Sequence, residues 1–292
     1  MGIEIIANYT SWTMDPREYA RQAEAQGFAG VSCSDHFFRT SSYPHLWVTL
    51  ASMAAATERV FLMSSFANNL FRSPVEFVQA SLTMQAVSGG RFEAGLGAGW
   101  LEKEIHGSGL VYPDAPGRAR RFKEAIVVCR ELLATGTCRF SGEFYDIDVP
   151  TIGPFIGDPP PLVASLGGPW TMRNIAPLVD RVELKFGEST RGGDLDMTAL
   201  AKVTRDDLVA RIAAVRDVAP DVPIGAFAMI GVGTDAELAT LRGQLTGGVY
   251  GDFVGSPAQV SDALESLSDL GIDRVQVTER LKGSALRLLA DS

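Results

Sequence analysis

Short apolar stretches alternate with longer stretches of helical pattern along the whole chain. Eight short stretches, rich in β-branched and small apolar residues, are typical of buried strands. The predicted strands are Ile3–Ala7, Gly30–Ser34, Val60–Ser65, Phe92–Leu96, Pro161–Ser165, Arg181–Lys185, Ile224–Ile230 and Arg274–Thr278. The predicted helices are Asp15–Gln26, Pro44–Thr57, Pro74–Val87, Pro116–Ala134, Trp170–Leu178, Arg205–Asp217, Asp235–Leu245 and Pro257–Leu270.

Strands that alternate with helices imply parallel pairing, and eight such units are the number that closes a (β/α)8 barrel. We therefore predict an α/β fold of this TIM-barrel class, with all 292 residues in one domain. An open, doubly wound sheet is the alternative. Because a helix at Leu281–Leu289 follows the last strand, one earlier helix either precedes its partner strand or is an insertion.

Local signals support several helix boundaries. Asp15-Pro16, Ser73-Pro74 and Ser256-Pro257 each place a capping side chain before a proline at the first helical position. Glycines stand where three helices should end. They are Gly27, Gly136 and Gly271.

Two segments break the alternation. Gly136–Pro160 is too long for an ordinary connection and is rich in glycine, proline and aromatic residues, and Glu188–Lys202 follows the sixth strand. Barrel enzymes build lids and substrate walls at the carboxyl ends of their strands. We expect both insertions to lie there and to set the substrate.

The acidic composition excludes several classes of protein. A formal net charge of −9 argues against nucleic acid and membrane surfaces as partners. No apolar run approaches the ~20 residues of a membrane span, and the first residues lack the basic region of a signal peptide. The three cysteines and three histidines show no metal-binding spacing, so we expect no metal site. We expect a cytoplasmic protein that binds a small molecule.

In a barrel, the polar residues just after each strand meet at one end. Four such segments stand out at Ser34–Phe38, Ser64–Asn69, Gly97–Trp100 and Ser165–Pro169. Glycine-rich backbone leaves room for a flat ring, and a glycine turn before a helix offers free N–H groups to a phosphate. The sequence therefore predicts a ligand site at this mouth.

The glycine run Gly95-Leu96-Gly97-Ala98-Gly99-Trp100 fails the dinucleotide fingerprint, because Trp100 replaces its third glycine. It either lets a cofactor approach the backbone or serves close packing at a crowded barrel rim. Other residues have two interpretations as well. Asp35 contacts a ligand, or it caps a helix or forms a turn, and His36 transfers protons or packs. Arg72 orders its loop or pairs with Glu76, and the alternative is that it touches the substrate.

Three passages resemble the bacterial luciferase-like superfamily of flavin and deazaflavin oxidoreductases. They are SDHF at Ser34–Phe37, RSPVEFVQASLTMQAVSGGRFEAGLGAGW at Arg72–Trp100, and FVGSPAQVSDALESLSDLGIDRVQV at Phe253–Val277. The resemblance extends from the first strand to the last and implies a (β/α)8 barrel, as the strand count does. It implies FMN or the deazaflavin coenzyme F420 as cofactor, and SDHF is more similar to the deazaflavin branch. A homodimer is expected from the family.

The resemblance also implies roles for individual residues. Asp35 would hydrogen-bond the coenzyme, His36 would be the catalytic proton donor or acceptor, and Ser65-Phe66 would form a cis peptide behind the ring. Gly97 and Gly99 would border the ring. The expected cofactor-binding residues are Asp35, Ser64, Ser65, Phe66, Gly97, Ala98, Gly99, Ser165, Gly167 and Gly168.

The chain departs from the family pattern at two places. Trp100 stands where some sugar-phosphate dehydrogenases carry a catalytic glutamate, which argues against sugar-phosphate oxidation and favours an apolar substrate pocket. The sixth strand ends in Glu183–Ser189, which is more charged than usual, and these charges face a substrate or pair with each other.

Taken with the resemblance, the sequence predicts an F420-dependent oxidoreductase that transfers a hydride between the coenzyme and a small organic substrate, in either direction. One alternative is an FMN-dependent monooxygenase that uses O2. A second alternative is a barrel that binds a flavin without turnover.

Overall fold

Eight parallel strands close a barrel in the computed structural model, which describes residues 2–10, 12, 14–38, 42–186, 190 and 192–290. The barrel strands, in order around the barrel, are β1 (Glu4–Tyr9), β2 (Gly30–Cys33), β3 (Phe61–Ser64), β5 (Phe92–Gly97), β8 (Leu162–Leu166), β9 (Arg181–Lys185), β10 (Ile224–Val232) and β12 (Arg274–Glu279). Because β9 also pairs with β10, the sheet closes on itself and the doubly wound alternative is wrong.

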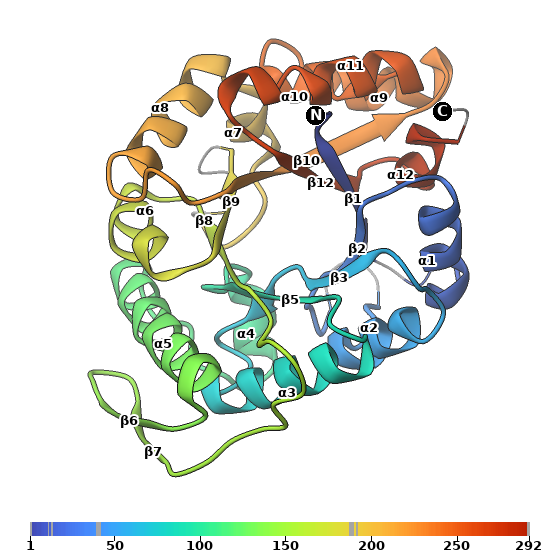
Figure 1. Cartoon of the computed structure of the whole chain (residues 1–292). Coiled ribbons are helices and arrows are strands. Elements are labelled where there is room, and N and C mark those ends of the chain that lie inside the picture. The colour runs from blue at the N-terminus through green and yellow to red at the C-terminus, as the bar shows by residue number, and fades with distance from the viewer. Residues whose placement is uncertain are drawn as a thin grey trace.

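A ring of helices surrounds the barrel (Figure 1). The long helices are α1 (Pro16–Ala25), α2 (Leu46–Ala54), α3 (Pro74–Val87), α5 (Ala115–Thr135), α8 (Arg205–Arg216), α9 (Asp235–Gln244) and α11 (Pro257–Glu265). The shorter elements are α4 (Glu102–Gly107), α6 (Pro169–Ile175), α7 (Met197–Ala201), α10 (Val249–Asp252), α12 (Ser284–Leu288), β4 (Ala67–Asn68) and β11 (Val254–Gly255), with 3-10 turns at Ala176–Leu178 and Ser268–Leu270. Within the described residues, no helix has the length and apolarity to cross a membrane.

The strand and helix predictions are confirmed, with boundaries that shift by a few residues. The uneven helix count is explained between β10 and β12, where α9, α10 and β11 come before α11. The predicted caps also form: Asp15, Ser73 and Ser256 each accept a backbone N–H of the helix that follows. The three predicted end glycines all have positive φ, at +87°, +74° and +81° in chain order.

The insertion Gly136–Pro160 does not lie where we expected. It leads from the end of α5 to the start of β8, and most of it forms a hairpin of β6 (Cys138–Ser141) and β7 (Asp146–Val149). Figure 1 shows this hairpin on the outside of the helix ring, beyond α5. Glu124 of α5 holds the hairpin turn by accepting three of its backbone N–H groups. A hairpin packed on an outer helix cannot form a lid over the barrel.

The inside of the barrel is unusually polar at its carboxyl end. Gln276 donates a hydrogen bond to Ser32 (2.7 Å), and Ser32 donates to Asn8 (3.0 Å). Below this network lie the apolar side chains of Ile6, Met63 and Val163, while most of the core lies between the sheet and the helices. The polar layer therefore faces the mouth of the barrel.

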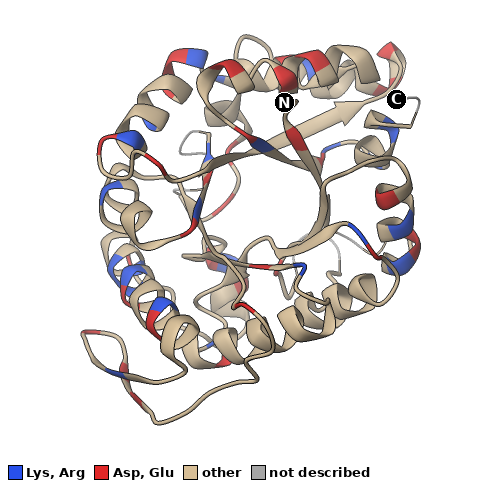
Figure 2. Cartoon of the chain, in the orientation of Figure 1, with Lys and Arg blue, Asp and Glu red and all other residues tan. Residues whose placement is uncertain are grey.

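Charged residues close the opposite end of the barrel. Most charges lie on the outer helices, and a few lie on the strands themselves (Figure 2). Arg274 binds Glu93 (2.6 Å) and Glu4 (3.0 Å) across the inside of the sheet. Glu183 lies fully buried at this end, and neither carboxyl oxygen has a hydrogen-bond partner among the described residues.

The charges at the end of the sixth strand therefore have different environments. Burial raises the pKa of Glu183 to about 8, because the effect of burial is larger than the opposite effect of the nearby arginine charges. Glu183 neither faces the mouth nor forms an ion pair, contrary to both of our expectations, whereas Lys185 points into the mouth. The rest of that segment, Gly187–Ser189, lies outside the described residues.

Candidate active site

The carboxyl ends of all eight barrel strands border one cavity of about 440 Å³. Its wall contains both polar and apolar side chains. Among the predicted site residues, those that line it are Asp35, His36, Ser65, Phe66, Gly97, Ala98, Gly99 and Ser165. Carboxyl ends of barrel strands are the usual position of active sites in this fold. This cavity is the candidate active site.

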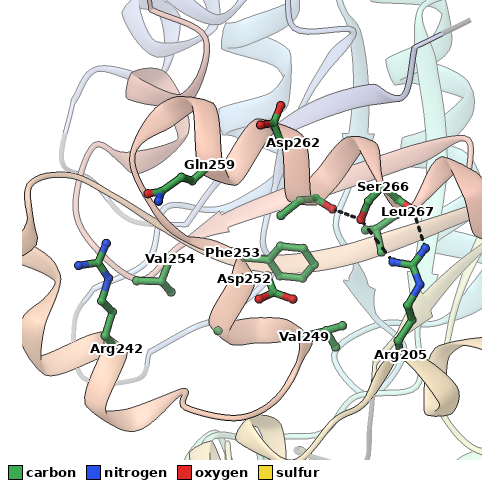
Figure 3. Close-up of a pocket in the computed structure, with 12 residues that line it drawn as sticks. Arg205, Arg242, Val249, Asp252, Phe253, Val254, Gln259, Asp262, Ser266 and Leu267 are labelled. Atoms are coloured by element: carbon green, nitrogen blue, oxygen red, sulfur yellow. Dashed lines mark hydrogen bonds between the residues drawn. The ribbon is translucent and has the colours of Figure 1, made fainter.

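A larger hollow of about 620 Å³ lies on the outside of the barrel, where α8, α9, α10 and α11 meet. Figure 3 shows Arg205 and Arg242 on opposite sides of it. Arg205 donates to the carbonyl of Ser266 (3.0 Å), and Arg242 pairs with Asp235 (2.6 Å). Both arginines already bind other groups of the protein, so we do not take this hollow as the active site.

His36 is held in place by a buried carboxylate. Its Nδ1 lies 2.8 Å from Oε2 of Glu104, whose side chain is fully buried in α4. The other Glu104 oxygen accepts the backbone N–H groups of Phe37 and Phe38, which fixes the carboxylate against this loop. A carboxylate accepts, so we assign the proton to Nδ1, which leaves Nε2 for the cavity.

Two aromatic rings restrict the imidazole further. The rings of Tyr43 and Trp100 meet that of His36 edge-on, with centroids 4.9 and 5.7 Å away. Trp100 and Tyr43 both line the cavity, so they narrow the access of water to the imidazole. His36 is thus an oriented side chain in the cavity wall.

Asp35 forms a buried ion pair beside the cavity. Its carboxylate accepts from Arg72 (2.5 and 3.3 Å) and from the backbone N–H of Asn68 (2.7 Å). Arg72 also pairs with Glu76 (3.2 Å), so it does order its loop as predicted. Since Oδ1 carries only the longer of these bonds, the carboxylate retains an acceptor position for a ligand.

The peptide bond between Ser65 and Phe66 is cis, as the resemblance implied. Both residues line the cavity, directly beside the glycine run. Ser64, in contrast, exchanges hydrogen bonds with the backbone of Gly95 (2.8 and 2.9 Å) and does not line the cavity. The structure therefore gives Ser64 a role in joining β3 to β5 and does not bring it to the candidate ligand site.

The glycine run serves close packing as well as the cavity. A Cβ at Gly95 would lie 2.0 Å from the Ser64 carbonyl oxygen, and one at Gly97 would lie 3.1 Å from the Phe66 Cβ. Gly99 has a φ of +81°, a conformation that side chains disfavour. Close packing is confirmed. Gly97 and Gly99 also form part of the cavity wall, and the approach of a cofactor to them stays a prediction.

The glycine turn after β8 lies just outside the cavity. Gly167 and Gly168 do not line it, and the Gly168 N–H is directed at the Thr171 side chain of α6 (3.3 Å). Ser165 does line the cavity, and its buried hydroxyl has no hydrogen-bond partner among the described residues. Phosphate binding by the two glycines stays a prediction.

The second insertion contributes to the cavity as expected. Thr190, Leu195 and Met197, within Glu188–Lys202, line the wall next to β9. They face the apolar side chains of β10, where Phe227 and Met229 point inward. This side of the cavity is therefore partly apolar, and an apolar substrate pocket stays a prediction.

Residues 14–240 match the model of the luciferase-like monooxygenase family. The chain belongs to this family. Such a match covers the segments that supply Asp35, His36, the cis peptide and the glycine run. The family resemblance is confirmed, and the passages Ser34–Phe37 and Arg72–Trp100 lie within the matched residues.

Curated relatives of this luciferase-like chain include F420-dependent glucose-6-phosphate dehydrogenases. That of Amycolatopsis mediterranei is 32% identical over 157 residues, which are 52% of this chain and 47% of the relative. That of Kineococcus radiotolerans is 29% identical over 198 residues, which are 66% of this chain and 58% of the relative. The chain thus spans about half the length of the curated relatives it matches.

Solved structures of similar fold cover nearly the whole chain. An F420-dependent secondary alcohol dehydrogenase in complex with an F420-acetone adduct has a TM-score of 0.75 and 17% identity, covering 99% of this chain and 98% of that one. Monooxygenase RslO1 from Streptomyces bottropensis has a TM-score of 0.78 and 17% identity, covering 99% and 97%. At such low identity these structures establish the luciferase-like barrel and nothing further.

One residue of the candidate site was missed from the sequence. Glu104 lies four residues beyond Trp100 on a short helix. Extending the search for polar residues from the end of each strand to the next helix would have found Glu104. Lys185, the last residue of β9, belongs to the charges that were expected to face a substrate or pair with each other, and it lines the cavity. Burial lowers the pKa of Lys185 to about 8.

The cavity fits a flat, polar-edged ring such as a deazaflavin. Gly97 and Gly99 leave one wall of the cavity without side chains. Asp35 adds an acceptor at the rim. A bare wall with polar groups at its border is what a ring with hydrogen-bonding edges requires.

Proposed function

We propose that this protein is an F420-dependent oxidoreductase that transfers a hydride between the coenzyme and a small organic substrate. The observation that carries the proposal is the His36–Glu104 pair in the same cavity as Asp35 and the cis Ser65-Phe66 peptide. The curated relatives, which are F420-dependent glucose-6-phosphate dehydrogenases, support F420 over FMN. In the same proposal, the protein acts in the cytoplasm as a homodimer.

When bound, the deazaflavin would supply a carbon that accepts or donates a hydride. The wall of Gly97–Gly99 and the Ser65-Phe66 peptide would hold the ring, and Asp35 would hydrogen-bond one of its edges. Gly167 and Gly168, beside the cavity, would hold the phosphate. These residues would leave the opposite side of the ring to the substrate.

His36 would move the proton that balances the hydride. In alcohol oxidation, Nε2 takes the hydroxyl proton; in reduction, the protonated imidazole gives a proton to the oxygen or nitrogen that receives it. Glu104 holds the proton on Nδ1 and so keeps Nε2 available as the base. Trp100 and Tyr43 would exclude water from this transfer.

The coenzyme assignment is tested by titrating the purified protein with F420 and with FMN while following the quenching of their fluorescence. We expect F420 to bind at least tenfold more tightly than FMN. Tighter binding of FMN, together with oxygen uptake on addition of reduced FMN, would instead identify a monooxygenase. Coenzyme binding without turnover over a broad substrate panel would identify a non-catalytic barrel.

A variant test examines Asp35 directly. Asp35→Asn keeps the shape but removes the charge that pairs with Arg72, so we expect weaker F420 binding and a lower melting temperature. Glu76→Gln, at the exposed end of the same arginine, is the matched control and should bind F420 as the wild type does. Unchanged F420 affinity in Asp35→Asn would refute the role of Asp35. Light scattering tests the homodimer.

A further inference from the structure

One cationic side chain in the cavity has no counterion among the described residues. Lys185, the last residue of β9, lines the cavity and is partly buried. Its ammonium group makes no hydrogen bond or ion pair within the described part of the chain, and its burial is the only influence on its pKa. A cation held partly out of water without a partner is costly unless a ligand completes the site.

The acidic groups of the cavity are already engaged elsewhere. Asp35 is bound by Arg72 and a backbone N–H group. Glu279 accepts the backbone N–H groups of Gly283 (2.8 Å) and Ala285 (3.2 Å). Neither of these carboxylates neutralises Lys185, so the positive charge is directed to the cavity itself.

A second unpartnered donor lies on the neighbouring strand. Ser165 of β8 is 8% exposed, lines the cavity and has a hydroxyl without a hydrogen-bond partner in the described part of the chain. Ser165 of β8 lies opposite Glu183 of β9. Lys185 follows Glu183 by two residues on β9, so its side chain points to the same inner face of the barrel. An ammonium and a hydroxyl on adjacent strands form a suitable site for one oxyanion.

Lys185 lies away from the proposed ring site. The residues proposed to hold the coenzyme ring lie on or directly after β2, β3 and β5, whereas Lys185 lies on β9. A Cβ at Gly167, which is proposed to hold the coenzyme phosphate, would lie 3.6 Å from the Lys185 Cβ, so the F420 affinity of a Lys185 variant decides between a coenzyme and a substrate oxyanion. The neighbours of Lys185 in the wall are the apolar residues Phe186 and Phe227, and the insertion that contains Leu195 follows it. A ligand bound there would have an apolar body next to its negative charge.

We propose that Lys185, assisted by Ser165, binds a carboxylate of the substrate, so that this site selects small organic acids with an apolar body. The proposal rests on the proposed function only in taking this cavity as the substrate site. It makes Lys185 a specificity-determining residue, with no part in the proton transfer of His36.

Benzoate and benzamide test this assignment, because they have the same ring and size and differ in charge. Calorimetric titration of the purified wild type, with and without saturating F420, should show at least about tenfold tighter binding of benzoate. Lys185→Met should lose this preference while its benzamide affinity stays within twofold. Lys185→Arg should retain most of it. Lys103→Met, at an exposed lysine of α4, is the matched control and should behave as the wild type.

A wild type that does not prefer benzoate, or a Lys185→Met variant that still does, would overturn the proposal. So would a tenfold loss of F420 affinity in Lys185→Met, since it would assign the lysine to the coenzyme. A wild type that binds no F420 would contradict the proposed function alone, because the comparison of benzoate with benzamide in the free protein still decides the role of Lys185.

Discussion

Paired side chains carry the candidate chemistry, and the pairing decides what each residue can do. His36 alone could equally be a packed aromatic residue. With Nδ1 fixed by the buried Glu104, it presents a single nitrogen to the cavity. Asp35 and Arg72 show the same principle, because each neutralises the other where water is scarce.

Replacing Glu104 with glutamine should lower kcat by about 10²-fold and change the F420 dissociation constant by less than threefold. The amide oxygen would go on accepting the N–H groups of Phe37 and Phe38, so the NH2 group would face Nδ1. The imidazole of His36 would then carry its proton on Nε2, so Nε2 could no longer act as the base. Steady-state kinetics on any substrate that the wild type accepts measure the effect.

Glu102→Gln, at an exposed position of the same helix, is the control for that experiment and should keep wild-type kcat. The pH dependence of kcat separates orientation from simple destabilisation, since a loss of fold would lower the rate equally at every pH. A Glu104→Gln variant with wild-type kcat would show that His36 does not depend on the carboxylate.

At the scale of elements, two glycines serve different purposes: Gly95 allows two strands to pack closely, whereas Gly243 lies in a helix with free space around it. Gly95→Ala would place a methyl group 2.0 Å from the Ser64 carbonyl oxygen, where only backbone can yield. We expect a loss of about 3 kcal/mol or more in the free energy of unfolding, because β3 and β5 must separate. Urea unfolding followed by circular dichroism measures it.

Gly243→Ala is the opposite case and serves as control. Gly243 lies inside α9, and no atom approaches its Cβ position within 4 Å. Alanine should therefore stabilise the protein by about 0.5–1 kcal/mol through helix propensity. If both substitutions changed stability by similar amounts, the contact between Ser64 and Gly95 would not be a tight one.

Local signals explain why the elements could be predicted from the sequence. Apolar strand stretches, proline after a capping residue and glycine at helix ends depend on neighbours in the chain. The position of Gly136–Pro160 depends instead on Glu124 of α5, which binds its turn, and no local pattern reveals that contact. Glu104 was missed for the same reason, since its importance arises only when α4 packs against the loop that carries His36.

The hairpin of β6 and β7 should be dispensable for ligand binding. Replacing 138–149 by a short Gly-Ser linker removes a part that packs on α5 outside the barrel and supplies no cavity residue. We expect the F420 dissociation constant to change less than twofold while the melting temperature falls, because the contacts with Glu124 are lost. Fluorescence titration and thermal unfolding check the two effects, and a tenfold weaker binding of F420 would restore the lid interpretation.

Across the whole molecule, the barrel separates a polar mouth from a charged, closed base. The base contains the ion pairs of Arg274 with Glu93 and Glu4, and beside them the unpartnered carboxyl of Glu183. A carboxyl group at this depth is more stable with its proton than without it. The stability of the fold should therefore depend on pH through a residue that never meets the ligand.

The direction of that dependence follows from the pKa. The folded protein keeps the proton of Glu183 up to about pH 8, whereas the unfolded chain loses it near 4.5. Between these values the folded state binds more protons, so the contribution of Glu183 to stability is complete below pH 4.5 and falls as pH rises to about 8.

Glu183→Gln keeps the shape of the side chain and removes its titratable proton. The free energy of unfolding of the variant minus that of the wild type should rise by about 3 kcal/mol from pH 5 to pH 8 and then level off. Urea unfolding of both proteins at each pH measures this difference, in which groups common to both, including Lys185, cancel. A difference independent of pH would show that Glu183 is ionised in the folded barrel, with Arg274 as its partner.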